Sequence, residues 1–98
     1  MTKRNIEFAH AVTRYRELGK ISRTDLATRS FMDASYITLI EKHGYVPKPD
    51  KVKCLADALG LGKESTDILM VTAGYAPVYV PVVDMIHLVR SYHSIGGV

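Results

Sequence analysis

The fold is decided by the stretch from Ser22 to Leu61, which reads SRTDLATRSFMDASYITLIEKHGYVPKPDKVKCLADALGL. It begins with two short helical patterns, separated by a tight connection at residues 29–32. A loop with one Gly and two Pro residues follows, and then an amphipathic segment that stops at Gly60. Because apolar residues recur at helical spacing in each segment, the sequence predicts an all-α domain.

Polar residues mark where these helices should begin. Ser22 is placed to cap the first of them, with Asp25 three places later completing a capping box. Asp33 is the expected N-cap of the next helix, Asp50 the start of the helix that follows, and Ser65 the cap of another. Together with a first helix over about residues 5–18, these signals predict five helices before Gly74.

The character of the chain changes after Gly74. Residues 75–80 are aromatic and β-branched, which predicts a short extended or strand-like segment. Pro81 then fits the first turn of a last helix, over about residues 82–93, with a broad apolar stripe. We therefore predict two parts, residues 1–74 and an association segment at residues 75–98. The expected dimer interface is Val82, Met85, Ile86, Val89 and Tyr92.

Charge is distributed unevenly along the 98 residues, whose formal net charge is +3. Residues 1–53 hold 11 Lys and Arg against 6 Asp and Glu, whereas residues 54–98 hold 2 against 4. A basic first half suits a surface that faces phosphate groups. An ordinary solvated surface with uneven charge explains the same pattern, so both interpretations stay open at this point.

Several functional classes lack their sequence signals. The four His residues and the one Cys have no metal-ligand spacing, and no phosphate-binding Gly loop or nucleophile motif is present. We expect no enzyme activity, no cofactor and no metal. The longest stretch without charge, Ile68 to Val83, is shorter than the ~20 residues that span a bilayer. With no signal peptide and no possible internal disulfide, a cytoplasmic protein without a membrane segment is expected.

Four fragments in order resemble the phage repressor/Cro-type (xenobiotic-response-element) helix-turn-helix family: residues 19–27, 36–42, 47–49 and 55–61. The resemblance covers roughly residues 8–61. It implies a five-helix, repressor-like helix-turn-helix domain whose third helix enters the major groove of DNA. The core positions that it implies are Leu26, Ala27, Ile37, Ile40, Leu55 and Leu59.

The resemblance also implies which residues read bases. They are Ala34, Ser35 and Leu39, with Tyr36 and Thr38 beside them. Ser35 and Thr38 can donate or accept at base edges, whereas Ala34 and Leu39 can only touch apolar groups such as a thymine methyl. No Arg, Gln or Asn stands in this row, and Leu39 also suits a core or interface position.

Two further sets of residues follow from the resemblance. The expected phosphate contacts are Arg23, Lys42, His43, Tyr45 and Lys48, although any one Lys can equally be a solvated side chain. Arg16 and Glu41 match a partly buried structural ion pair whose loss would cost ~3 kcal/mol. The alternative for this pair is two separate surface charges.

The chain departs from the family at two glycines. Phe31 stands where the family has a Gly in the left-handed conformation, which is unfavourable for Phe. We therefore expect a remodelled connection, with Phe31 or Met32 packed as a plug. At the end of the third helix His43 takes the place of the family's other Gly, and Gly44 follows.

These observations predict a small dimeric regulator of transcription, most simply a repressor, that binds double-stranded DNA as a homodimer. Two alternatives stay open. One is a protein-interaction module that keeps the fold without reading DNA. The other is the antitoxin of a toxin–antitoxin pair, whose C-terminal segment would hold a protein partner.

Overall fold

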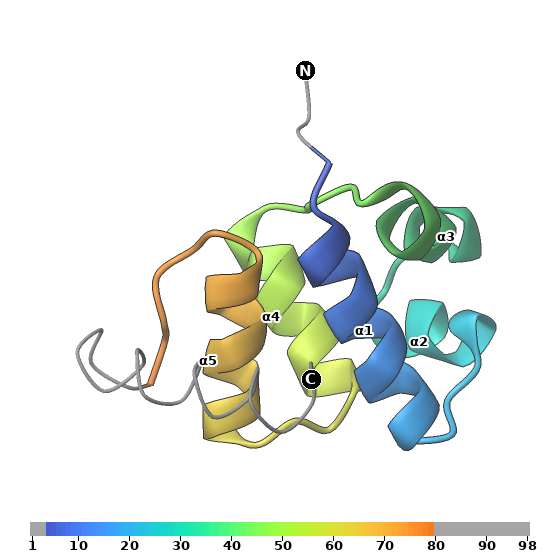
Figure 1. Ribbon diagram of the computed structural model, residues 1–98. Helices are drawn as coiled ribbons and strands as arrows, with labels where there is room; N and C mark the ends of the chain where they lie inside the picture. Colours follow the sequence, from blue (N-terminus) through green and yellow to red (C-terminus); the bar gives the residue numbers. More distant parts are fainter. Residues whose placement is uncertain (1–3, 80–98) are drawn as a thin grey trace.

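A computed structural model describes residues 4–79 of the chain, which form five helices and no strand (Figure 1). The all-α prediction is therefore confirmed for these residues, and the extended or strand-like segment expected after Gly74 contains no strand at residues 75–79. The helix expected at residues 82–93, with its proposed dimer interface, lies outside the described residues. The helices are α1 (Ile6–Leu18), α2 (Arg23–Arg29), α3 (Ala34–His43), α4 (Pro49–Ala58) and α5 (Lys63–Thr72).

The first three helices begin at polar caps. The Asn5 side chain accepts a hydrogen bond of 2.9 Å from the backbone N–H of Phe8, which caps α1. The Ser22 hydroxyl accepts one of 3.0 Å from the N–H of Asp25, as predicted for α2. Asp33 is the N-cap residue of α3, but its side chain makes no capping hydrogen bond.

The last two helices begin earlier than predicted. Lys48 is the N-cap of α4, so the helix starts at Pro49 and not at Asp50. Proline suits this first position because a helix leaves the N–H there unbonded. The N-cap of α5 is Gly62 and not Ser65, because the carbonyl of Gly62 already accepts a hydrogen bond of 2.9 Å from Thr66.

The core lies where α1 meets the other helices. In Figure 1, α1 runs through the middle, with α2 and α3 on one side and α4 and α5 on the other. Phe8 and Val12 of α1 and Leu69 of α5 are fully buried in this centre. All six predicted core residues are buried as well: Leu26, Ala27, Ile37, Ile40, Leu55 and Leu59.

Candidate nucleic-acid interface

The turn between α2 and α3 is a left-handed helix end. The N–H of Phe31 donates to the carbonyl of Thr28 over 3.3 Å, and the N–H of Met32 donates to that of Ala27 over 2.9 Å. Phe31 has φ 59°, in the left-handed region. This pair of bonds and this φ define the Schellman motif, in which the residue at the position of Phe31 is usually Gly.

The backbone of this turn is therefore not remodelled as predicted, and of the two residues predicted to pack as a plug only Met32 does so. The two hydrogen bonds keep the tight geometry although a Phe occupies the position of the Gly. Met32 packs against the core, which fits the apolar contact that this residue of the motif usually makes. Phe31 is 89% exposed, so it is no plug. The side chain at the left-handed position therefore meets solvent.

One face of α3 is buried and the other meets solvent. Ile37 and Ile40 are completely buried, whereas Ala34 and Ser35 are exposed. Leu39 is 46% exposed, which excludes a core position for it. Ser35 and Leu39 are four residues apart, so they lie on the same face of the helix. The described structure thus presents a small hydroxyl and an apolar side chain together.

Thr38 and Tyr36 are less available than the sequence suggested. Thr38 is half-buried, and its hydroxyl donates to the carbonyl of Ala34 over 3.2 Å within α3. Tyr36 is half-buried against the core and meets the Tyr45 ring edge-on, with 5.3 Å between the ring centres. Burial and the hydrogen bond with Tyr45 raise the pKa of Tyr36 to about 12. Its position favours a packing role.

The remaining predicted phosphate contacts differ in exposure. Lys42 and His43 at the end of α3 are exposed, as is Lys48 at the start of α4. Tyr45 is half-buried with Tyr36 and packs against the core. Three cationic or titratable side chains thus lie near the C-terminal end of α3 on the surface.

The ion pair between Arg16 and Glu41 is present and has a second arginine. Nε of Arg16 donates to Oε2 of Glu41 over 2.7 Å, and Nη2 donates to Oε1 over 3.0 Å. Nε of Arg23 donates to the same Oε1 over 3.0 Å. The Glu41 side chain is only 1% exposed. One carboxylate therefore ties together α1, α2 and α3.

Electrostatics favour the charged form of this cluster. Burial acts to raise the pKa of Glu41, but the hydrogen bonds from Arg16 and Arg23 outweigh it and hold the pKa below its ordinary value. The hydrogen bond to Glu41 raises the pKa of Arg16. The cluster stays ionised at neutral pH and fixes α3 on the body of the domain.

Arg23 has a structural contact that the sequence did not suggest. It was expected only at phosphate, yet its Nε is bound to Glu41. Its side chain is still 38% exposed, and a guanidinium carries five N–H donors. The two residues are 18 apart in the chain, so no local pattern could have indicated the contact.

The other end of α3 closes with Gly44. This residue has φ 71°, and its N–H donates to the carbonyl of Ile40 over 3.1 Å. Its carbonyl accepts a hydrogen bond of 2.8 Å from the N–H of Asn5. A Cβ at this position would stand 2.8 Å from that same nitrogen. Glycine is thus required both by the backbone and by the close approach of the chain before α1.

Asp67 is a buried acid that sequence reasoning missed. It is fully buried in α5, and its Oδ1 accepts a hydrogen bond of 2.7 Å from the N–H of Val78. The N–H of Tyr79 bonds the same carboxylate over 3.0 and 3.1 Å. The ammonium groups of Lys53 and Lys63 lie 5.7 and 5.8 Å from the Tyr79 ring centre. These contacts therefore hold Val78 and Tyr79 against α4 and α5.

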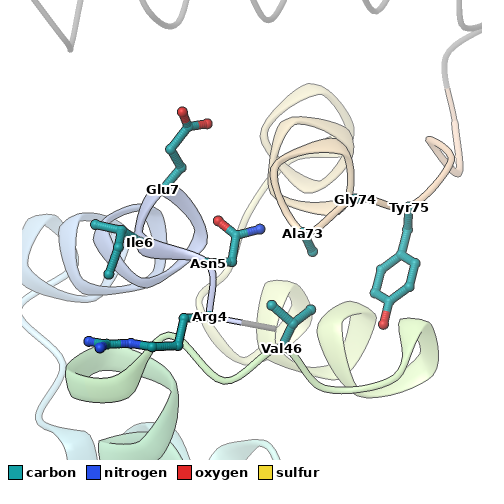
Figure 2. A pocket seen from close by; sticks show the side chains of 8 residues that line it. All are labelled: Arg4, Asn5, Ile6, Glu7, Val46, Ala73, Gly74 and Tyr75. Carbon is teal, nitrogen blue, oxygen red and sulfur yellow. The ribbon is translucent and has the colours of Figure 1, made fainter. Parts of the chain in front are cut away.

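A hollow lies on another part of the surface (Figure 2). Inside it the Asn5 amide donates to the carbonyl of Thr72 over 2.9 Å, and the Tyr75 hydroxyl donates to that of Pro47 over 2.6 Å. These polar groups hold elements of the domain together, so we place the candidate site at α3. The hollow measures about 610 Å³ and is lined by Arg4, Asn5, Ile6, Glu7, Val46, Ala73, Gly74 and Tyr75.

Comparison with known proteins gives no assignment: no family model, no curated protein and no solved structure matches this chain. Over residues 4–79, no helix has the length and apolar character that a membrane crossing needs. The same residues contain no cluster of His, Cys, Asp and Glu suited to a metal ion. The interpretation of the site therefore depends on its own geometry.

Proposed function

We propose that α2 and α3 act as a helix-turn-helix that binds double-stranded DNA, with α3 in the major groove. The chain would serve as a small dimeric regulator of transcription. The observation that carries this proposal is the exposed face of α3, formed by Ala34, Ser35 and Leu39, on a helix whose opposite face is buried. The major groove is ~12 Å wide and admits one α-helix whose side chains then meet base edges.

The attachment of α3 supports the same proposal. A reading helix must keep its orientation while it meets the duplex, because small displacements would break contacts to base edges. Glu41 supplies such an attachment through Arg16 and Arg23, which come from α1 and α2. Lys42 and Lys48 are exposed nearby and suit phosphate groups.

The residues on this face favour a particular type of DNA site. Ala34 and Leu39 offer only apolar contact, which among the bases suits the C5-methyl group of thymine. Ser35 adds one hydroxyl that can donate or accept. We expect recognition of a thymine-containing site with modest discrimination, because none of these side chains makes a bidentate contact to a base.

Fluorescence anisotropy tests DNA binding directly. The protein would be titrated against the DNA upstream of its own gene and against a scrambled duplex, at low and moderate salt. We expect tighter binding to the upstream DNA that persists at moderate salt. Equal and steeply salt-sensitive binding to both would leave only phosphate contacts. An absence of binding even at low salt would refute the proposal and favour the interaction module or the antitoxin.

A matched pair of variants locates the interface. Leu39→Glu adds a negative charge to the proposed reading face, whereas Leu18→Glu adds the same charge to the end of α1, where Leu18 is 72% exposed. We expect Leu39→Glu to lower affinity at least tenfold, or about 1.4 kcal/mol, through repulsion by phosphates. The Leu18→Glu protein should bind like the unaltered one. Equal effects of the two changes would contradict the assignment to α3.

Dimerisation through residues 75–98 is a separate part of the proposal. Replacement of Ile86 and Val89 by Glu should give monomers, seen by sedimentation, that bind DNA weakly. A dimer places two reading helices about one DNA turn (~34 Å) apart, which a monomer cannot do. Monomers that bind at full strength would rule out this part.

A further inference from the structure

Phe31 is an aromatic residue in an unfavourable place. Its φ of 59° lies in the left-handed region, where an L-residue with a Cβ is strained. Its ring is also 89% exposed, so it gains almost nothing from burial in the domain. A glycine would remove both costs at this position without changing the turn.

The fold itself does not need the ring. The backbone bonds of the turn are made by N–H and carbonyl groups, which any residue supplies. The apolar contact of the motif comes from Met32, which packs against the core. Strained residues that the fold does not require are concentrated at functional sites. The ring of Phe31 is therefore a candidate for contact with a ligand.

Its place in the chain indicates which ligand this is. Phe31 precedes Ala34 by three residues, so their Cα atoms are at most ~11 Å apart. Ala34 and Ser35 are the exposed residues of the first turn of α3. A major groove that receives this turn is ~12 Å wide, so an exposed side chain within this distance of Ala34 can reach the wall of the groove. That wall consists of deoxyribose and phosphate.

We propose that the Phe31 ring packs against deoxyribose at the edge of the groove that α3 enters. This inference rests on the proposed function. A phenyl ring has apolar surface and no charge, so it would add affinity by burial and release no counterions. Because every nucleotide presents the same sugar, the ring would strengthen binding to all sequences by the same factor.

Three variants separate the ring from the strain. Phe31→Ala removes the ring and keeps a Cβ at the left-handed position, Phe31→Gly removes both, and Phe31→Tyr keeps the ring. Affinities would be measured by anisotropy for a preferred and a scrambled duplex at several salt concentrations. Thermal unfolding without DNA would follow stability, and sedimentation without DNA the oligomeric state.

We expect Phe31→Ala and Phe31→Gly to lose about tenfold in affinity for both duplexes, the amount expected for an aromatic ring of which a large part is buried. The slope of log affinity against log salt should stay unchanged, because no phosphate contact is lost. Phe31→Gly should nevertheless melt at a higher temperature, and Phe31→Tyr should bind like the unaltered protein.

Each other outcome overturns the inference in a recognisable way. Equal binding by all four proteins would reject the contact while leaving the proposed function intact. A flatter salt slope, or a loss confined to the preferred duplex, would mean a changed helix position and not a sugar contact. A shift to monomers without DNA would assign the ring to a second copy of this chain. If the unaltered protein binds no duplex, both the inference and the proposed function fail.

Discussion

The two residues that flank α3 in the left-handed conformation have different roles. Gly44, after the helix, is buried, and an added Cβ there would stand 2.8 Å from the nitrogen of Asn5. Phe31, before the helix, has a similar φ but an exposed side chain. At Gly44 close packing leaves no room for a Cβ, so glycine is required there. At Phe31 the chain keeps the same left-handed geometry in spite of strain, so glycine is not required.

The two ends of α3 also differ in how they are attached to the rest of the domain. The carbonyl of Gly44 accepts a hydrogen bond from the chain before α1, and Glu41 in the last turn of α3 binds two arginines. The turn that contains Phe31 closes on carbonyls of its own helix, α2. One end of α3 is therefore fixed to the body of the domain, and the other presents its side chains outward. A helix that reads a groove with its first turns needs this arrangement.

The largest effect is expected for Gly44→Ala. The added Cβ meets the backbone of Asn5 and places a strained left-handed residue in a packed turn. Overpacking and strain together should lower the free energy of unfolding by about 4 kcal/mol. Urea unfolding of the two proteins measures this difference. A loss below about 1 kcal/mol would show that this turn tolerates a side chain as readily as the turn at Phe31.

Glu41→Gln should lower stability by about 3 kcal/mol, because the two arginines would lose their buried counter-charge. Asp57→Asn is the matched control, since Asp57 is exposed and pairs with Lys53 at the surface. That change should cost less than about 1 kcal/mol. Equal costs for the two variants would contradict a firmly attached C-terminal end of α3.

The pH dependence of stability tests the same cluster. The pKa of Glu41 is lowered in the folded protein. The contribution of ionised Glu41 to the stability of the fold is therefore fully present above the unfolded pKa of about 4.3. The contribution is lost as the pH falls through the folded pKa. The stability difference between the unaltered protein and Glu41→Gln should therefore shrink below about pH 4. A difference that is the same at pH 7 and pH 3 would refute an ionised Glu41.

The smallest effect on stability is expected for Phe31→Gly, and it is a gain where the other variants lose stability. Phe31→Gly relieves the left-handed strain but makes the unfolded chain more flexible, so the net gain in stability should be about 0.5–1 kcal/mol. Phe31→Ala keeps the strain and should bring no gain. Chemical unfolding of both variants decides the point. A destabilised Phe31→Gly protein would show that the ring supports the fold.

Local features of the fold could be predicted from the residues themselves, whereas the one long-range contact that was predicted, between Arg16 and Glu41, came from the family resemblance. The Ser22 cap followed from cap chemistry, which acts over a few residues, and the burial of Ile37 and Ile40 followed from the family resemblance. The contacts from Arg23 to Glu41 and from Tyr79 to Asp67 join residues 18 and 12 apart, and no periodicity marks them.

The turn before α3 shows a different limit. The family resemblance implied a left-handed residue at position 31, and two backbone hydrogen bonds do hold Phe31 at φ 59°. Side-chain preference alone favoured a remodelled turn, because Phe avoids this region. Backbone bonds that close a helix end were strong enough to override that preference. The exposed face of α3 was implied by the family resemblance: Ala34, Ser35 and Leu39 are exposed, whereas Tyr36 and Thr38 are half-buried.

The central claim is that the exposed face of α3 meets DNA, and backbone amide NMR during titration with a duplex tests it most directly. We predict that the largest changes in chemical shift fall on Phe31, Ala34, Ser35 and Leu39, while residues of α5 such as Leu69 change little. Changes that gather on α4 and α5, or saturating DNA that leaves the signals of α3 unmoved, would contradict the account.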